Sequence, residues 1–172
     1  MIQIEKFVAA TIDSCAHIFE SLISFSLSTE TLEQQIYLES VPKNVSQEIV
    51  ASMMFTGENM GALTFYMPYD LALFILIDLL DEAVDVNTDI FAPLGEFINL
   101  LAGGIKNRLS GTEIDCYELS IPYVSSGEIQ EDLFNPEQAN FLIPIDTEMG
   151  IFYVGLFWDD TDAIQEQKLI QY

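Results

Sequence analysis

The sequence is poor in basic residues. Five lysines and arginines stand against 28 aspartates and glutamates, which gives a formal net charge of −23 at pH 7 over 172 residues. Sequence-independent binding to nucleic acid needs a cationic surface that releases counterions from phosphates, and docking on anionic lipid needs the same complementarity. The composition therefore predicts no binding to nucleic acid and no association with a membrane surface.

Cysteine and histidine are also scarce. Cys15 and Cys116 are too few for a disulfide framework, and His17 stands in no spacing that resembles a zinc site. We therefore expect reduced core thiols, no metal site and no cofactor bound by this chain.

Long hydrophobic runs are missing as well. The strongest apolar run, residues 71–80, is interrupted by Asp78 and is shorter than the about 20 residues that a bilayer requires. Glu5 and Lys6 interrupt the first apolar residues, which argues against a secretory leader. The sequence predicts a cytoplasmic protein without a transmembrane segment.

Half of the residues are hydrophobic, so the chain is able to bury a core, and we expect a single domain over 1–172. Apolar spacings of three and four predict helices, and alternating segments predict strands. Helices are expected at 4–26, 69–82 and 88–109, and strands at 36–40, 46–55, 61–66, 114–121, 141–145 and 151–157. This order indicates an α+β fold in which an antiparallel sheet carries helices on one face.

Three segments carry further expectations. The helix at 69–82 is apolar nearly all round and should be buried on most sides. Residues 122–140 are acidic and punctuated by proline and glycine, which predicts a long exposed loop or lid; the role of its acidic part, 127–137, stays open. Residues 159–172 are expected to form a short helix or a flexible tail.

The third expected helix has two contrasting faces. Thr88 or Asp89 can cap its start, and Ser110-Gly111 provides a stop after Leu109. At roughly 100° per residue, one arc of this helix is apolar and predicts the core side, and it contains Leu94, Phe97, Ile98, Leu101, Ile105 and Leu109. The opposite arc is small or polar and contains Gly95, Glu96, Asn99, Gly103 and Lys106.

This polar arc is a candidate site for a partner. Glycine inside a helix costs about 0.5–1 kcal/mol relative to alanine, so Gly95 and Gly103 on one exposed stripe suggest close approach by another molecule. Glu96 can meet a cation of the partner, and the Asn99 carboxamide can both donate and accept a hydrogen bond. Such an amide orients a water molecule without taking its proton.

The motif around Asn99 resembles the CheX branch of the CheC/CheX/FliY family of response-regulator phosphatases. Residues 95–103 read GEFINLLAG and match the E-x-x-N-x-x-x-G pattern of the family. Residues 119–127, LSIPYVSSG, are similar to the family's strand that ends in proline before a glycine-containing loop. The resemblance extends from about residue 7 to 157 and implies a CheC/CheX-like fold.

The resemblance implies hydrolysis of the aspartyl phosphate on a phosphorylated CheY-like receiver in chemotaxis or another two-component pathway. In that role Asn99 orients the attacking water, Glu96 pairs with a receiver lysine, and Gly95, Gly103 and Lys106 contact the receiver. Mg²⁺ is expected in the active site of the receiver. The CheX proteins that the chain resembles are dimers that pair through their sheets, so a homodimer is expected.

A second site is not expected. CheC members carry another E-x-x-N on the first helix, but the stretch taken to correspond here, Glu20 to Ile23, has isoleucine in place of asparagine. A further match, Glu137 to Asn140, runs directly into a strand and has no glycine at the expected position. It is interpreted as a coincidence.

Two other functions remain open. The chain can be a non-catalytic module that binds a receiver or a flagellar component, like the motor-switch proteins that share the fold of this family. It can also be a carboxylate-based hydrolase that uses Glu113, Asp115 and Glu118, although acids at every second position are more typical of the solvated face of a strand.

Overall fold

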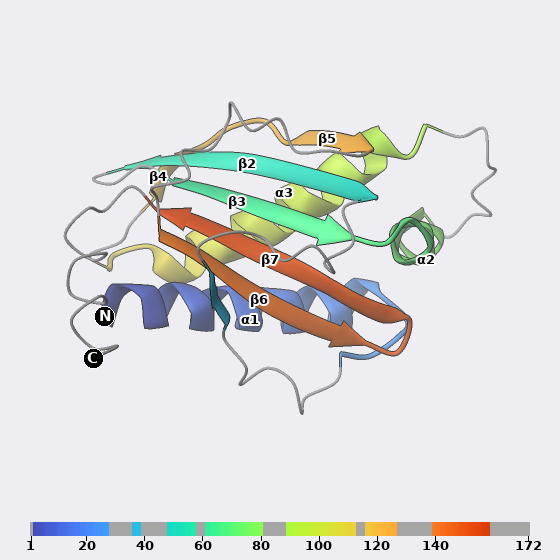
Figure 1. The fold of residues 1–172 in the computed structure, drawn as a ribbon, viewed down its shortest axis with the longest axis horizontal. Coiled ribbons are helices and arrows are strands. Elements are labelled where there is room, and N and C mark those ends of the chain that lie inside the picture. Colours follow the sequence, from blue (N-terminus) through green and yellow to red (C-terminus); the bar gives the residue numbers. More distant parts are fainter. Residues whose placement is uncertain are drawn as a thin grey trace.

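A computed structural model describes residues 2–27, 36–38, 48–57, 61–80, 89–112, 116–126 and 139–158. These residues form an α+β fold, as predicted, with three helices and an antiparallel sheet (Figure 1). In chain order the elements are α1 (Ile2–Leu22), β1 (Ile36–Leu38), β2 (Ile49–Gly57), β3 (Gly61–Met67), α2 (Tyr69–Leu80), α3 (Phe91–Leu109), β4 (Cys116–Leu119), β5 (Tyr123–Ser126), β6 (Ala139–Thr147) and β7 (Gly150–Trp158).

The sheet is built from two hairpins laid side by side. Its strand order is β1-β6-β7-β3-β2-β4, with β5 also paired to β2, and every pairing is antiparallel. The β6–β7 turn has Gly150 at φ +128°, a conformation that glycine adopts without the cost of a Cβ. These pairings bring segments from both halves of the chain into one sheet.

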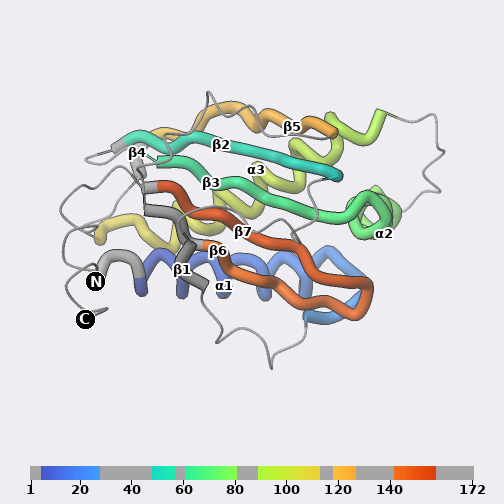
Figure 2. The backbone as a smooth tube through the Cα atoms, in the orientation of Figure 1, coloured from blue at the N-terminus to red at the C-terminus, as the bar shows by residue number. Residues whose placement is uncertain are grey.

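The main core lies between the sheet and two helices. Helices α1 and α3 cover the same face of the sheet, which is the far side in Figures 1 and 2. Side chains alternate along β3, so Leu63, Phe65 and Met67 join the helix-side core, while Tyr66 belongs to a smaller cluster on the opposite face. Helix α3 is therefore packed against the sheet through this core.

The architecture contains an internal two-fold repeat. The strand order is symmetric about the β7–β3 pair, because β6 and β2 occupy equivalent places, as do β1 and β4. Strands β2 and β6 each have nine residues and begin 90 residues apart. The same offset of 90 relates Phe7 of α1 to Phe97 of α3, and both phenylalanines are buried. Helix α3 is thus the counterpart of α1.

The expected loop at 122–140 is wrong in its first part. Tyr123–Ser126 form strand β5, which pairs with Ile49–Ser52 of β2. The preceding expected strand, 114–121, is shorter in the structure and covers Cys116–Leu119. Proline usually disrupts a strand, but an edge strand tolerates proline because its outer N–H has no ladder partner. The acidic part, 127–137, and the terminal segment, 159–172, lie outside the described residues.

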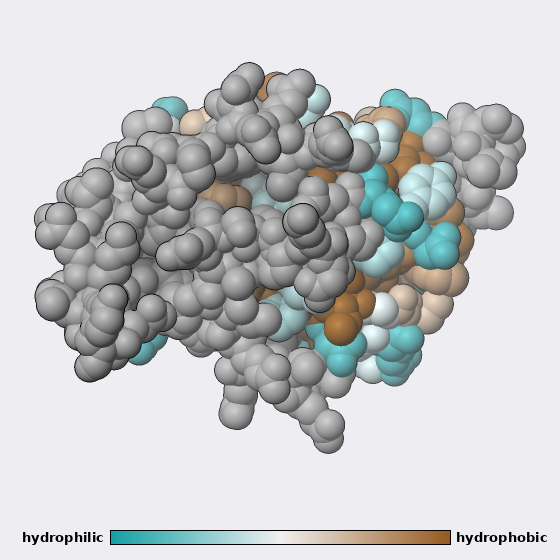
Figure 3. Space-filling view, in the orientation of Figure 1, coloured by the Kyte–Doolittle hydropathy of each residue, from teal (hydrophilic) through white to brown (hydrophobic). Residues whose placement is uncertain are grey.

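Helix α2 is less buried than expected. Its buried side contains Leu71, Ala72, Ile75 and Leu76. Phe74 and Ile77 are each 40% exposed. The helix lies at one end of the sheet and packs along one side only, and apolar atoms reach the surface at this end of the molecule (Figures 1 and 3). No described helix has the length and hydropathy that a membrane span requires.

Cys15 is a core thiol, as predicted, and it should resist alkylation in the folded protein. Burial raises the pKa of Cys15 from its ordinary 9.0 to about 12, and Arg108 only partly offsets this. The folded chain at pH 8 therefore holds about a thousandfold less Cys15 thiolate than an exposed thiol does. Iodoacetamide labelling, read by mass spectrometry on the Cys15 peptide, should be complete in denaturant and negligible in native protein. Rapid native labelling of that peptide would contradict the burial.

The raised pKa of Cys15 also makes the stability of the folded chain depend on pH in the alkaline range. Because the thiol pKa is higher in the folded chain, the contribution of Cys15 to stability is intact below pH 9 and is lost as the pH rises from 9 to 12.

Candidate functional site

Helix α3 ends at Leu109, as predicted, but its N-cap position is Ile90 and not Thr88 or Asp89. The Asp89 carboxylate accepts a hydrogen bond of 3.0 Å from the N–H of Phe91, while Ile90 occupies the N-cap backbone position without a side-chain bond. Thr88 lies outside the described residues. After Leu109 the chain turns through Gly111 at φ +75°. The helix is continuous through its two central glycines.

The core side of α3 is confirmed. All six apolar residues predicted for it are buried: Leu94, Phe97, Ile98, Leu101, Ile105 and Leu109. The Phe97 ring packs edge-on against Phe19 of α1, with centroids 6.1 Å apart. This packing fixes the rotation of α3 about its axis and therefore decides which side chains face outward.

The outward side carries the predicted polar pair. Glu96 and Asn99 are exposed on the same helix face, three residues apart, and Gly103 follows one turn after Asn99. A Cβ added at Gly103 would meet no atom within 4 Å. The helix surface at Gly103 is therefore open to a second molecule.

Gly95 corrects part of the expected stripe. It is buried and faces β5, and a Cβ at this position would lie 3.4 Å from Cγ of Pro122 and 3.9 Å from Cγ2 of Val124. The wheel placed Gly95 beside Asn99 but carried no information on β5, which covers that side of the helix. Because Gly95 is buried, exposure no longer supports its expected contact with a partner.

Gly104 fixes the crossing of α3 over α1, a role that sequence reasoning missed. A Cβ at Gly104 would overlap the Ser14 hydroxyl, which donates a hydrogen bond of 2.9 Å to the Leu101 carbonyl. Arg108 strengthens the crossing, because its guanidinium donates to the Gly104 carbonyl and to the Asp13 carbonyl, at 3.1 Å each. Asn99 therefore stands on a helix that is locked to its neighbour one turn away.

Lys106 lies two turns beyond Asn99 and is half-buried. It is thus separated from the Glu96 and Asn99 pair along the helix, and its proposed contact with a partner stays a prediction. Within the described ranges, no group of three or more histidine, cysteine, aspartate or glutamate side chains is placed to hold a metal ion. Glu118 is exposed on β4, and Glu113 and Asp115 lie outside those ranges.

The internal repeat shows which residue of α1 corresponds to Asn99. The Ser14 to Gly104 contact lies at the 90-residue offset, so Asn99 corresponds to Ala9 and not to Ile23. Ala9 is exposed, whereas Ile23 is buried after the end of α1. The register chosen from the sequence was therefore wrong, but the described part of α1 still lacks a second glutamate and asparagine pair.

Comparison with solved structures shows the fold. Chemotaxis protein CheX from Vibrio vulnificus is 19% identical, with a TM-score of 0.73 over 89% of this chain and 99% of that one. A CheC-like superfamily protein from Shewanella sp. PV-4 is 17% identical, with a TM-score of 0.73 over 90% and 98%. The CheX–CheY–BeF₃–Mg²⁺ complex from Borrelia burgdorferi matches with 19% identity and a TM-score of 0.69, over 91% and 97%.

Sequence comparison identifies the family. No curated protein matches the sequence significantly. The family described as chemotaxis phosphatase CheX matches residues 49–145, which is more than half of the chain and includes all of α3. The chain that presents Glu96 and Asn99 on this helix therefore belongs to the CheX family of chemotaxis phosphatases.

Proposed function

We propose that the protein hydrolyses the aspartyl phosphate of a CheY-like receiver, with Asn99 and Glu96 as the residues that act on it. One observation carries the proposal: a carboxylate and a carboxamide stand together, exposed, on a helix whose opposite side is fully buried. The family match and the similarity to a CheX chain solved in complex with CheY support this choice of substrate.

In the proposed reaction, water attacks the phosphorus atom and the bond between phosphorus and the aspartyl oxygen breaks. The aspartate leaves as a carboxylate, and the phosphoryl group leaves as inorganic phosphate, which shares the water protons with solvent. The Asn99 amide accepts a hydrogen bond from the water and holds it in line with the bond that breaks. Because the amide takes no proton, its contribution is position, which alone can lower a barrier by several kcal/mol.

Glu96 holds the helix in register with the receiver. Its carboxylate pairs with a receiver lysine, and this contact places Asn99 over the phosphoryl group. Mg²⁺ is held by the receiver and offsets charge on the phosphoryl oxygens. The pairing of two copies of the chain through their sheets stays a prediction.

The decisive measurement is the decay of a phosphorylated receiver. The protein, present below the receiver concentration, should accelerate release of inorganic phosphate with multiple turnovers. If it binds the receiver tightly and the phosphate is lost at the receiver's own rate, the chain is an interaction module of the motor-switch type and the proposal fails.

The Glu96 contact predicts a salt-dependent loss. Glu96→Gln keeps the shape of the side chain and removes its charge, so kcat/KM should fall about tenfold at low salt, mainly through KM. Salt screens the ion pair, so the difference in kcat/KM between Glu96→Gln and wild type should be smaller at high than at low ionic strength. Steady-state kinetics at several salt concentrations measure it, and Glu20→Gln, an exposed acid on α1, is the matched control. Equal kcat/KM for Glu96→Gln and wild type would contradict the pairing.

A further inference from the structure

The edge strand next to α3 contains a bulge. Leu119 pairs with Phe55, and Tyr123 pairs with Ser52. Three residues of the edge, 120–122, therefore lie opposite two residues of β2, Met53 and Met54. Such an extra residue bends a strand and redirects its side chains, and bulges are frequent beside functional sites.

Ile121 directly precedes a residue that lies against α3. Ser120 lies opposite Met54, to which its backbone N–H donates a hydrogen bond of 2.9 Å. Ile121 and Pro122 therefore share the place opposite Met53, and Met53 belongs to the helix-side core. Pro122 packs on Gly95 of α3, the residue before Glu96. Ile121 is thus one residue away from the contact between the sheet edge and α3, next to Glu96.

Ile121 is exposed to an unusual degree. Its side chain is 87% exposed, whereas the other large apolar side chains on the surface of the described residues are 39–52% exposed. Its neighbours in the sequence use their side chains within the fold: the Ser120 hydroxyl accepts a hydrogen bond of 2.9 Å from the N–H of Met54, and Pro122 contacts α3. The folded chain gains almost nothing from burial of Ile121, so the side chain is available to a partner.

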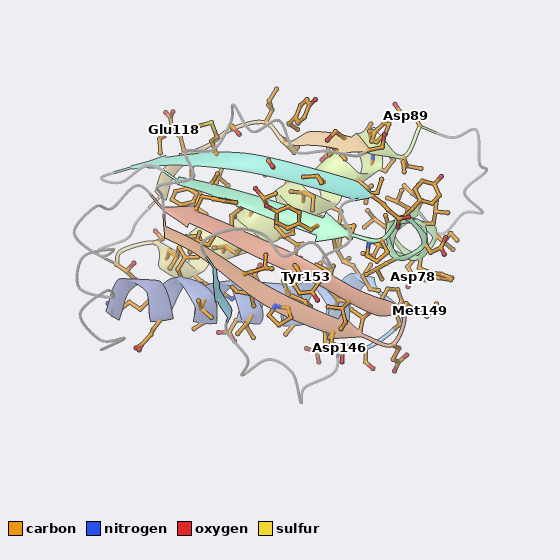
Figure 4. All side chains as sticks on the ribbon, viewed as in Figure 1. Asp78, Asp89, Glu118, Asp146, Met149 and Tyr153 are labelled. Carbon is orange, nitrogen blue, oxygen red and sulfur yellow. The ribbon has the colours of Figure 1, made fainter. Side chains whose placement is uncertain are left out.

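Helix α3 and the described edge residues that follow β4 contain few acidic residues. Acidic residues make up 28 of 172, about one in six, yet Glu96 is the only acid in 91–107 and 119–126 together. Figure 4 shows Glu118 on β4 and Asp89 beside the start of α3. Within the described residues, these two stretches therefore carry far less negative charge than the net charge of −23 for the chain suggests.

We propose that Ile121 is an affinity-determining contact for the receiver, in which its side chain buries against an apolar patch on the receiver surface. This inference rests on the proposed function and adds a residue to it. Salt screens the attraction between charged groups on two proteins, whereas burial of an isoleucine side chain contributes to binding at any ionic strength. In this proposal Glu96 positions the helix on the receiver, Asn99 acts in the reaction, and Ile121 increases the affinity of the complex.

The test separates affinity from catalysis. The CheY-like receiver of the same organism, activated with beryllofluoride and Mg²⁺, is titrated with wild type and with Ile121→Ser, and steady-state dephosphorylation follows. We expect Ile121→Ser to raise Kd and KM by about tenfold or more, with kcat within about twofold of wild type. The loss should be the same at low and at high salt. Ile121→Met, which keeps an apolar side chain, should restore most of the affinity.

Ile151→Ser is the matched control, because Ile151 is a 40% exposed isoleucine on β7 and two strands separate β7 from β5. An unchanged Kd for Ile121→Ser, or a fall in kcat at constant KM, would overturn the inference. If wild type binds the receiver but does not dephosphorylate it, the proposed function fails while the Kd comparison still decides the role of Ile121. If wild type does not bind the receiver, both proposals fall.

Discussion

Asn99→Ala should abolish nearly all of the acceleration of receiver dephosphorylation, with a fall in kcat of about a hundredfold or more. The amide is proposed to act only when water is held in line with the phosphoryl group, so its loss removes an interaction of the transition state and not of the bound complex. KM and the affinity for a beryllofluoride-activated receiver should therefore change little. Release of inorganic phosphate under saturating receiver measures the effect.

The control for this variant comes from the same helix. Asn107 is also an exposed asparagine of α3, two turns beyond Asn99, so Asn107→Ala matches the chemistry and the helical position. Because Asn99 is exposed, Asn99→Ala should keep the thermal unfolding midpoint of wild type. Unchanged turnover in Asn99→Ala, with normal folding, would remove Asn99 from the reaction.

The second large effect concerns stability. Gly104→Val should destabilise the protein by about 2 kcal/mol or more, because a Cβ at this position overlaps the Ser14 hydroxyl and a branched side chain has no space between α1 and α3. For a chain of this length, that loss corresponds to a midpoint lower by about 5 °C or more. Calorimetry or circular dichroism on heating would detect it, and an unchanged midpoint would mean that the two helices are not in close contact here.

The adjacent glycine should respond in the opposite direction. Gly103→Ala meets open space, so the better helix propensity of alanine should stabilise the fold by about 0.5–1 kcal/mol. If a partner approaches the helix at Gly103, the same variant should raise KM for the receiver. Two neighbouring glycines would then differ in kind: one serves the fold of this chain, and the other serves its partner.

Much of the site could be predicted from the sequence because it lies on one helix. The period of α3 separates a core side from an outward side, and burial of six predicted residues with exposure of Glu96 and Asn99 confirms that separation. The predicted exposure of Gly95 was wrong because it depends on a contact outside the helix. A helical wheel describes a helix alone, and Gly95 lies against Pro122, which directly precedes β5 and is 27 residues later in the chain.

The missed features are all non-local. Strand β5 is four residues long and follows a proline, so its local pattern is weak, and only its pairing with β2 makes it a strand. The Ser14 contact with Gly104 joins residues 90 apart in sequence. The internal repeat is hard to see in the sequence because equivalent positions in its two halves carry different residue types. Segments 7–14 and 97–104, for example, read FVAATIDS and FINLLAGG.

The internal repeat has a consequence for the number of sites that this architecture can carry. Both α1 and α3 lie against the same sheet in equivalent places, so the frame that presents Asn99 exists twice in one chain. In the second copy, Lys6 and Ala9 stand where Glu96 and Asn99 stand in the first. A site in this architecture is therefore gained or lost by changing a few surface side chains. Such changes leave the packing of the buried core unaltered.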